Sequence, residues 1–281
     1  MNIKSLDKSE YYFGHKACAG CGGALAVRIA LKVLGERCIS AFPAGCVSAV
    51  AFVFPQLALA GNAIISTFAG MASMMTGIAA GLRARGETDF QVVGFAGDGG
   101  TADIGIQALS GAIDRNDDIL YICYDNEAYM NTGIQKSSLT PTGATTTTTP
   151  TGSLSRGNAS GKKDMLAIVA ANGISYAATA SVGYMNDYME KIEKASKIRG
   201  TKYIQVLAPC PTGWGYETAN TIELAKLAVD CGVWRLREYE NGKFSEKPAK
   251  GGNVSEYIRQ QGRFSHLSDK EINSISDNLS I

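Results

Sequence analysis

This chain of 281 residues lacks an excess of either positive or negative charge. Its 27 lysines and arginines stand against 26 aspartates and glutamates, which leaves a net charge of +1. Proteins that bind nucleic acid carry a surplus of basic residues, so this balance argues against that class. Charged residues make up only 19% of the chain and hydrophobic residues 45%, a composition that excludes a disordered chain and provides for a sizeable core.

A secretory leader and a membrane-spanning segment are also missing from the sequence. The stretch MNIKSLDKSEYYFGHK is polar, so we expect a cytoplasmic protein. Residues 38–82 carry no charge, but Pro43, Pro55 and several glycines interrupt the run of about 20 apolar residues that a transmembrane helix needs. We therefore expect buried strands and helices here, or a surface covered by another subunit.

Short apolar strands alternate with helical patterns along most of the chain. The expected strands cover residues 38–42, 91–96, 119–124, 175–179 and 203–208, and the expected helices residues 22–34, 70–85, 101–113, 164–172, 185–198 and 217–229. This alternation predicts an α/β fold with a doubly wound, mostly parallel sheet. We assign it to a domain of residues 1–234, followed by a polar C-terminal arm, residues 235–281, with a few short helices. Lys162 and Lys163 are expected to be solvated at the start of a helix.

A glycine-rich turn follows the strand expected at 91–96. In Gly-Asp-Gly-Gly at 97–100, Asp98 lies at the carboxyl end of the strand, the edge where open α/β sheets bind ligands. Gly97 and Gly99 allow backbone N–H groups to approach a phosphate. Asn126 follows the next strand, 28 residues after Asp98. Carboxylate and amide oxygens suit Mg²⁺ bound to a diphosphate, although an Asp-Gly turn can also be only a turn.

Seven cysteines suggest a metal or redox site in a chain without a secretory leader. Cys18 and Cys21 form a C-x-x-C pair, the spacing of zinc and iron–sulfur sites. Two more, Cys46 and Cys210, stand in glycine- or proline-containing turns where loops can converge. The remaining three lie in apolar runs and are expected in the core: Cys38, Cys123 and Cys231.

Together, the two groups of residues resemble the thiamine diphosphate-binding β subunit of 2-oxoacid:ferredoxin oxidoreductases, the pyruvate synthase family. The resemblance spans roughly residues 14–267, through the strings HKACAGCGGALA, GDGGTADIGIQALSGA, YDNEAYMNTGIQKSSLTPTGA, KKDMLAIVAANGI, VLAPCPTGW and QGRFSHL. It implies the thiamine diphosphate-binding fold. It also implies oxidative decarboxylation of a small 2-oxoacid, with electrons passing through a [4Fe–4S] cluster to ferredoxin.

The same resemblance implies a role for individual residues. Mg²⁺ would be held by Asp98, Asn126 and the backbone oxygen of Ala128, with Gly97 and Gly99 at the diphosphate. Asn131 matches a catalytic position near the thiazolium ring and the substrate. The cluster ligands would be Cys18, Cys21, Cys46 and Cys210, and Cys46 would also border the organic cofactor.

Partners and substrate are implied by the family as well. An α-type subunit would supply the glutamate that activates thiamine, γ and ferredoxin-like δ subunits would complete the complex, and coenzyme A would accept the acyl group. Two departures leave pyruvate, oxalate or another 2-oxoacid open as substrate. Residues 49–62 read AVAFVFPQLALAGN where pyruvate-type members are aromatic-rich, and Gly23 stands where glutamate is common. Apolar residues 47–59 are expected to keep water from the site.

Two other functions fit parts of the pattern. One is a non-redox thiamine diphosphate decarboxylase or synthase whose cysteines bind zinc or nothing. The other is a non-catalytic assembly subunit stabilised by zinc. Brown colour in anaerobically purified protein would support the cluster over both, because an iron–sulfur cluster absorbs broadly near ~400 nm and zinc does not. Colourless protein that binds thiamine diphosphate would favour the first alternative, and colourless protein that does not bind it the second.

Overall fold

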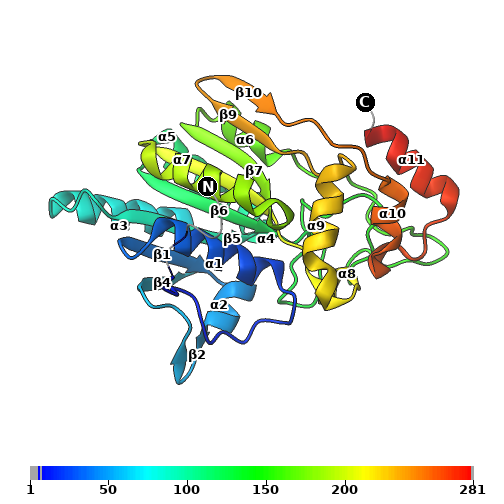
Figure 1. Ribbon diagram of the computed structural model, residues 1–281, viewed down its shortest axis with the longest axis horizontal. Coiled ribbons are helices and arrows are strands. Elements are labelled where there is room, and N and C mark those ends of the chain that lie inside the picture. Colours follow the sequence, from blue (N-terminus) through cyan, green and yellow to red (C-terminus); the bar gives the residue numbers. More distant parts are fainter. Residues whose placement is uncertain (1–5, 7, 280–281) are drawn as a thin grey trace.

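The computed structural model describes residue 6 and residues 8–279, and its centre is an eight-stranded sheet (Figure 1). The strands are β1 (Cys38–Pro43), β4 (Asn62–Ser66), β5 (Gln91–Gly97), β6 (Ile119–Asp125), β7 (Tyr176–Ser181), β8 (Thr201–Leu207), β9 (Arg237–Glu240) and β10 (Lys243–Glu246). Their order is β10-β9-β7-β8-β6-β5-β1-β4. The six strands from β7 to β4 are parallel, and β9 pairs antiparallel with both β7 and β10. The mostly parallel sheet that the sequence predicts is confirmed.

Helices cover both faces of the sheet, which makes it doubly wound (Figure 1). One face packs against α1 (Gly22–Leu34) and α7 (Met185–Lys197), and the other against α3 (Met71–Ala84), α5 (Ile106–Asp114) and α6 (Met165–Ala171). All seven residues of β6 are buried. A strand enclosed on both faces needs apolar residues throughout, which explains its run ILYICYD.

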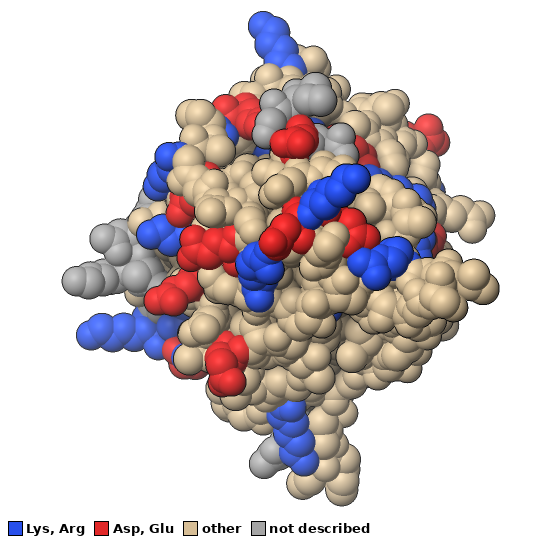
Figure 2. Space-filling view, turned by 90° about the vertical axis from the view of Figure 1, so that its right-hand side faces the viewer, with Lys and Arg blue, Asp and Glu red and all other residues tan. Residues whose placement is uncertain are grey.

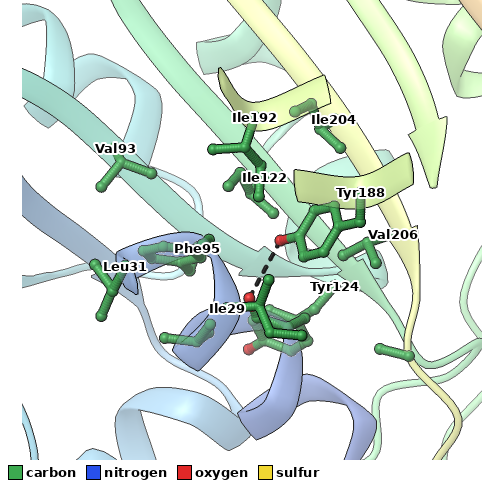
Figure 3. Close-up of a cluster of buried hydrophobic side chains, with 14 of the residues drawn as sticks. Ile29, Leu31, Val93, Phe95, Ile122, Tyr124, Tyr188, Ile192, Ile204 and Val206 are labelled. Atoms are coloured by element: carbon green, nitrogen blue, oxygen red, sulfur yellow. Dashed lines mark hydrogen bonds between the residues drawn. The ribbon is translucent and has the colours of Figure 1, made fainter. Parts of the chain in front are cut away.

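Alternate residues of the central strands form two separate cores. Phe95, Ile122 and Ile204 face α1 and α7 in the cluster drawn in Figure 3, whereas neighbours such as Tyr121 pack on the opposite face. Within the first cluster, the Tyr188 hydroxyl donates a hydrogen bond to the carbonyl oxygen of Ala26 at 3.2 Å (dashed in Figure 3). This bond joins α7 to α1 across the face of the sheet.

Truncating a side chain of this core should destabilise the chain strongly. Phe95 is 1% exposed, and its ring stacks on Phe42 at 5.4 Å. We expect Phe95→Ala to lower the free energy of unfolding by about 3–5 kcal/mol, because it removes buried apolar contacts and leaves a cavity. Urea unfolding measures the difference. Phe244→Ala on the edge strand β10, where the ring is 55% exposed, is the control and should cost less than about 1 kcal/mol.

The structure differs from the sequence expectations in three places. The helix expected at 101–113 is divided into α4 (Asp98–Ala102) and α5. A Cβ atom at Gly105 would lie 2.0 Å from the carbonyl oxygen of Gly100, so the chain turns where only glycine fits. Strand β4 was not expected. Residues 237–246, expected in an arm with a few short helices, extend the sheet as β9 and β10. All four residues of β10 are exposed, so this strand does not need the apolar pattern by which the other strands were recognised.

The rest of the C-terminal arm packs on a third hydrophobic cluster beside the sheet. Its elements are α9 (Thr221–Asp230), α10 (Val254–Arg259) and α11 (Asp269–Leu279), at the right of Figure 1. Trp214 and Trp234 belong to this cluster. The arm is therefore in contact with the end of β8 and the short helix α8 (Pro211–Trp214) that follows it.

The uncharged segment 38–82 is divided among several short elements. Between β1 and α3 these are the helix α2 (Cys46–Ala51), the two-stranded hairpin of β2 (Phe52–Val53) and β3 (Gln56–Leu57), and β4. Across the described part of the chain, no helix has the length and apolar character that a membrane crossing requires. Phe54 in the hairpin and Ile64 and Ile65 on the edge strand β4 are exposed.

Candidate active site

Four neighbouring strands of the sheet end at the same edge, and each is followed by a residue that the sequence singles out. In the sheet order these strands are β8, β6, β5 and β1. Asp98 and Asn126 come directly after β5 and β6, while Cys210 and Cys46 follow β8 and β1 by three residues. Because parallel strands share one direction, segments far apart in the sequence meet at the right-hand side of Figure 1.

A cavity of about 120 Å³ opens at this edge. Every residue expected at the organic cofactor lines it: Cys46, Gly97, Asp98, Gly99, Asn126, Ala128 and Asn131. Its apolar walls are Phe68, Tyr124 and Met130. The expectation that residues 47–59 would form these walls is wrong, because they fold into α2 and a hairpin whose Phe54 is 95% exposed.

Three groups converge at one end of the cavity with the geometry of a cation site. The carboxamide of Asn126 has one atom 2.9 Å from Asp98 Oδ1 and 2.9 Å from the carbonyl oxygen of Ala128. If this atom is the amide nitrogen of Asn126, it donates a hydrogen bond to each of the two oxygens. If it is the amide oxygen, three oxygens face one another, and their mutual repulsion requires a cation among them. Adjacent ligands of an octahedral Mg²⁺, each at about 2.0–2.1 Å, are about 2.9 Å apart, so these residues fit the ion.

Asp98 is buried next to further carboxylates. It is 1% exposed, and the hydroxyl of Ser137 donates to its Oδ2, which leaves Oδ1 facing Asn126. Burial and the negative charge of Asp125 raise the pKa of Asp98 well above its ordinary value. A carboxylate in such surroundings favours a bound cation, because the cation offsets both the lost hydration and the repulsion.

The loop after β6 is held in an unusual backbone conformation. Glu127 has φ +67°, a left-handed conformation that costs a non-glycine residue about 1–2 kcal/mol. Its N–H donates to Asp125 Oδ1 at 3.0 Å, and its carbonyl accepts from the Thr140 hydroxyl at 2.7 Å. The carbonyl of Asn126 accepts from Trp214 Nε1 at 2.8 Å. These bonds fix both peptides, so the Asn126 side chain faces Asp98.

Two cations next to this loop, one partly buried and one buried, were missed by the sequence analysis. Lys162, expected to be solvated, is bonded to Asp125 and Glu127, with 25% of its side chain exposed. Arg263, from the C-terminal arm, is 4% exposed and bonds Glu127 from the other side. The one available signal for each residue was its place in a string that carries the resemblance, KKDMLAIVAANGI for Lys162 and QGRFSHL for Arg263.

The predicted cluster cysteines lie at the starts of helices or next to one. Cys21 and Cys210 cap α1 and α8, where their sulfurs accept hydrogen bonds from Ala24 N at 3.4 Å and Gly213 N at 3.3 Å. Cys46 is the first residue of α2. Backbone N–H groups of this kind stabilise negative charge on sulfur.

The four predicted cluster cysteines influence one another's pKa. Burial raises the pKa of Cys46 to about 12, and Cys210, Cys21 and Cys18 each add to the shift. The pKa of Cys210, about 11, is raised by burial and by Cys21 and Cys18. The other three thiols do not contribute to either shift. Cys38 and Cys123 are buried as expected, whereas Cys231 is only partly buried.

A single-ion site is not assembled from these side chains. Among residue 6 and residues 8–279, no group of three or more His, Cys, Asp or Glu side chains is arranged to hold one metal ion. His15, just before the C-x-x-C pair, stacks on Tyr12 with ring centroids 4.6 Å apart.

Comparison with known proteins identifies the family. The thiamine pyrophosphate enzyme C-terminal TPP-binding domain matches residues 43–206. Pyruvate synthase subunit PorB of Methanocaldococcus jannaschii is 48% identical over 98% of this chain and 96% of its own. PorB of Methanothermobacter thermautotrophicus is 48% identical over 92% and 90%. The chain belongs to the PorB/VorB family of 2-oxoacid:ferredoxin oxidoreductase β subunits. The resemblance found in the sequence is confirmed.

A second kind of relative has a different substrate in its name. Ketoisovalerate oxidoreductase subunit VorB of Pyrococcus horikoshii is 46% identical over 95% of this PorB/VorB subunit and 89% of its own chain. Among solved structures, 2-oxoglutarate:ferredoxin oxidoreductase from Magnetococcus marinus matches with a TM-score of 0.62 at 19% identity, over 96% and 97% of the two chains. That likeness shows the fold. This PorB/VorB subunit is accordingly part of an enzyme and carries a thiamine diphosphate-binding domain.

Proposed function

We propose that this PorB/VorB-family subunit binds thiamine diphosphate through Mg²⁺ and carries a [4Fe–4S] cluster, in an enzyme that oxidatively decarboxylates a small 2-oxoacid and reduces ferredoxin. The observation that carries the proposal is the position of the Asn126 carboxamide, which lies 2.9 Å from Asp98 Oδ1 and 2.9 Å from the Ala128 carbonyl oxygen. It lies beside the ends of β5 and β6, in a cavity next to the cysteines.

In this function Asp98, Asn126 and Ala128 hold the ion, and the turn at 97–99 receives the diphosphate. A Cβ atom at Gly99 would lie 2.3 Å from the Tyr129 ring, so glycine is needed for the turn to pack beneath that ring. The hydroxyl of Tyr129 donates to Asp103 at 3.0 Å, which fixes the ring over the turn. The turn proposed to receive the diphosphate is therefore closely packed and held by a hydrogen-bonded ring.

The rest of the cavity orients the reacting part of the cofactor and the substrate. Bound thiamine diphosphate supplies the carbanion chemistry of decarboxylation, and the protein supplies placement. Asn131 is an exposed residue on the cavity rim, where its amide can hydrogen-bond a 2-oxoacid. Phe68, Tyr124 and Met130 exclude water on the other sides, which strengthens the electrostatic interactions inside.

The cysteines suit a cluster better than zinc. A zinc ion needs thiolates about 2.3 Å away on all sides, an arrangement that the described side chains do not form. A four-iron cluster takes four thiolate ligands, and Cys18, Cys21 and Cys210 each influence the pKa of Cys46 here. Cys46 lines the cofactor cavity, so a cluster bound to it would lie next to the cofactor.

Serine substitutions should divide the seven cysteines into two groups. Serine at position 18, 21, 46 or 210 is expected to remove most of the iron, because a hard hydroxyl replaces a soft thiolate ligand. The same change at Cys38, Cys123 or Cys231 should leave the iron content unchanged. Iron analysis and absorbance near ~400 nm of anaerobically purified enzyme measure the effect. Full iron in Cys210→Ser, or cluster loss in Cys231→Ser, would contradict the ligand assignment.

The substrate class is a small 2-oxoacid, with pyruvate as the first candidate. Pyruvate synthase and ketoisovalerate oxidoreductase subunits are both about equally similar to this chain. Reduction of a viologen dye by the assembled enzyme, measured with pyruvate, oxalate, 2-ketoisovalerate and 2-oxoglutarate, each with and without coenzyme A, tests the proposal. The proposal would be overturned if the assembled enzyme reduced the dye with none of these four acids.

Partner subunits complete this function. The only carboxylate that lines the cavity in the described chain is Asp98, so the glutamate that activates thiamine comes from an α-type subunit. Figure 2 shows the face toward which the strands point: its charges gather in a band across the middle, and the area below is mostly uncharged. An uncharged surface beside the site suits burial by a subunit. A ferredoxin-like subunit then carries electrons to ferredoxin.

A further inference from the structure

A buried network of four charges lies next to the loop that carries Asn126. Lys162 Nζ is 3.0 Å from Asp125 Oδ2 and 2.7 Å from Glu127 Oε1, and Arg263 Nη2 is 2.5 Å from Glu127 Oε2. The side chains of Asp125, Glu127 and Arg263 are 0%, 4% and 4% exposed. The Lys162 side chain is 25% exposed. Two buried carboxylates thus face one buried and one partly exposed cation with little screening by water, so the geometry of each contact matters. We call these four residues the Glu127 network.

The Glu127 network does not line the cofactor cavity. The cavity wall includes Asn126 and Ala128 but neither Asp125 nor Glu127. Along the loop, residues 126 and 128 therefore face the cavity, while residues 125 and 127 are held by the network. The orientation of the Asn126 amide and the Ala128 carbonyl therefore depends on how the network holds Asp125 and Glu127.

Glu127 is the residue whose backbone needs this support. Its φ of +67° is rarely adopted by a residue with a side chain. Such a conformation persists only where the surrounding contacts impose it. Lys162 Nζ lies 2.7 Å from one carboxylate oxygen of Glu127, and Arg263 Nη2 lies 2.5 Å from the other. The Glu127 side chain is therefore clamped between two cations.

Arg263 acts on both sides of the Asn126–Glu127 peptide. It bonds the Glu127 side chain directly, and its guanidinium lies 3.8 Å from the centre of the Trp214 ring. Trp214 in turn donates its Nε1 hydrogen to the Asn126 carbonyl at 2.8 Å. Gln261 fixes the Arg263 side chain by accepting from Nε at 2.9 Å. One residue of the C-terminal arm is thus connected to the Glu127 side chain and, through Trp214, to the backbone carbonyl of Asn126.

We propose that Arg263 and Lys162 are positioning residues for the Mg²⁺–diphosphate site. They clamp Glu127 in its left-handed conformation, and this aims the Asn126 amide and the Ala128 carbonyl at Asp98. The inference rests on the proposed function, since it takes these oxygens to be Mg²⁺ ligands. It adds that the C-terminal arm, through Arg263, controls the affinity of the site for its ion.

The experiment uses Mn²⁺ in place of Mg²⁺, because free Mn²⁺ can be counted by electron paramagnetic resonance. The assembled enzyme is titrated with Mn²⁺ at saturating thiamine diphosphate. In Arg263→Met we expect the apparent Kd for Mn²⁺ to rise at least about tenfold, the effect typical of residues that orient metal ligands. Iron content should stay unchanged. The matched control is Arg259→Met in the same arm, whose side chain is 52% exposed, and it should bind Mn²⁺ as the wild type does.

A double variant separates positioning from general damage to the fold. Glu127→Gln should weaken Mn²⁺ binding as Arg263→Met does, and the two changes together should cost no more than the larger of them. They act through one contact, so their effects should not add. Should Arg263→Met fail to fold, Arg263→Lys decides. It keeps the charge but loses the planar group, so its Mn²⁺ affinity should fall below that of the wild type at an unchanged melting temperature.

Three outcomes would overturn the inference while leaving the proposed function in place. These are wild-type Mn²⁺ affinity in Arg263→Met, wild-type affinity in Arg263→Lys, and additive losses in the double variant. A wild-type enzyme that binds thiamine diphosphate without any divalent ion would instead overturn the proposed function, and the inference with it.

Discussion

Replacing Asp98 with alanine is expected to abolish the binding of thiamine diphosphate. The substitution removes the only charged ligand proposed for Mg²⁺, and Asn126 and Ala128 offer only neutral oxygens. Loss of residues that merely orient metal ligands costs about 10- to 100-fold in affinity, so loss of the ligand itself should cost at least about 100-fold. Calorimetric titration with the cofactor and Mg²⁺ measures the effect.

The iron content of Asp98→Ala should be that of the wild type, because none of the proposed cluster ligands contacts this carboxylate in the structure. Asp98→Asn keeps an oxygen but loses the charge, so its affinity for the cofactor should lie between that of the wild type and that of Asp98→Ala. Asp89→Ala serves as the control. Asp89 is 60% exposed and pairs with Arg37 away from the cavity, so its removal should change nothing. Unchanged cofactor affinity in Asp98→Ala would exclude the metal role.

The isolated chain is expected to be inactive even when it is supplied with iron, Mg²⁺ and thiamine diphosphate. Activation of thiamine requires a glutamate in an apolar pocket within hydrogen-bond reach of the cofactor. Glu127 is the buried glutamate nearest the site, but Lys162 and Arg263 occupy both of its oxygens, and it does not line the cavity. Glu87 is at the surface and pairs with Arg37.

Viologen reduction dependent on a 2-oxoacid, measured on the isolated chain and on the assembled enzyme, tests this expectation. General acid–base groups contribute about 10²- to 10⁴-fold, so the isolated chain should be slower by at least about 100-fold. A cooperative unfolding transition of the isolated chain establishes that it is folded. Turnover at the rate of the assembled enzyme would show that an activating residue lies within this chain.

The local parts of the fold and of the site were predictable from the sequence. The strands β1, β5 and β6 begin and end close to their expected positions, because runs enclosed on both faces are apolar throughout. Asp98 and Asn126 were predictable as a pair for a related reason. Each directly follows a recognisable strand, and parallel strands bring their carboxyl ends to one edge.

Other features depended on contacts that no local pattern encodes. The sheet places β1 and β8 on either side of β5 and β6, which brings Cys46 and Cys210 to the same edge from 164 residues apart, 210 minus 46. The polar strand β9 joins the sheet by pairing with β7, and β10 then pairs with β9 at the sheet edge, where exposed residues suffice. A strand order of this kind is set by the packing of crossover helices, which the composition of a single segment does not record.

The charged residues near the site show most clearly what depends on local sequence and what depends on the tertiary structure. By itself, the sequence determined that a negatively charged turn and an amide follow two buried strands, because both strand burial and glycine turns can be recognised from consecutive residues. Only the tertiary structure decided that Lys162 and Arg263 would neutralise Asp125 and Glu127. A lysine or arginine has the same local pattern on a solvated surface as in a buried ion pair. Its role is set by the partner that the fold brings to it across 35 residues for Lys162, 162 minus 127, and 136 for Arg263.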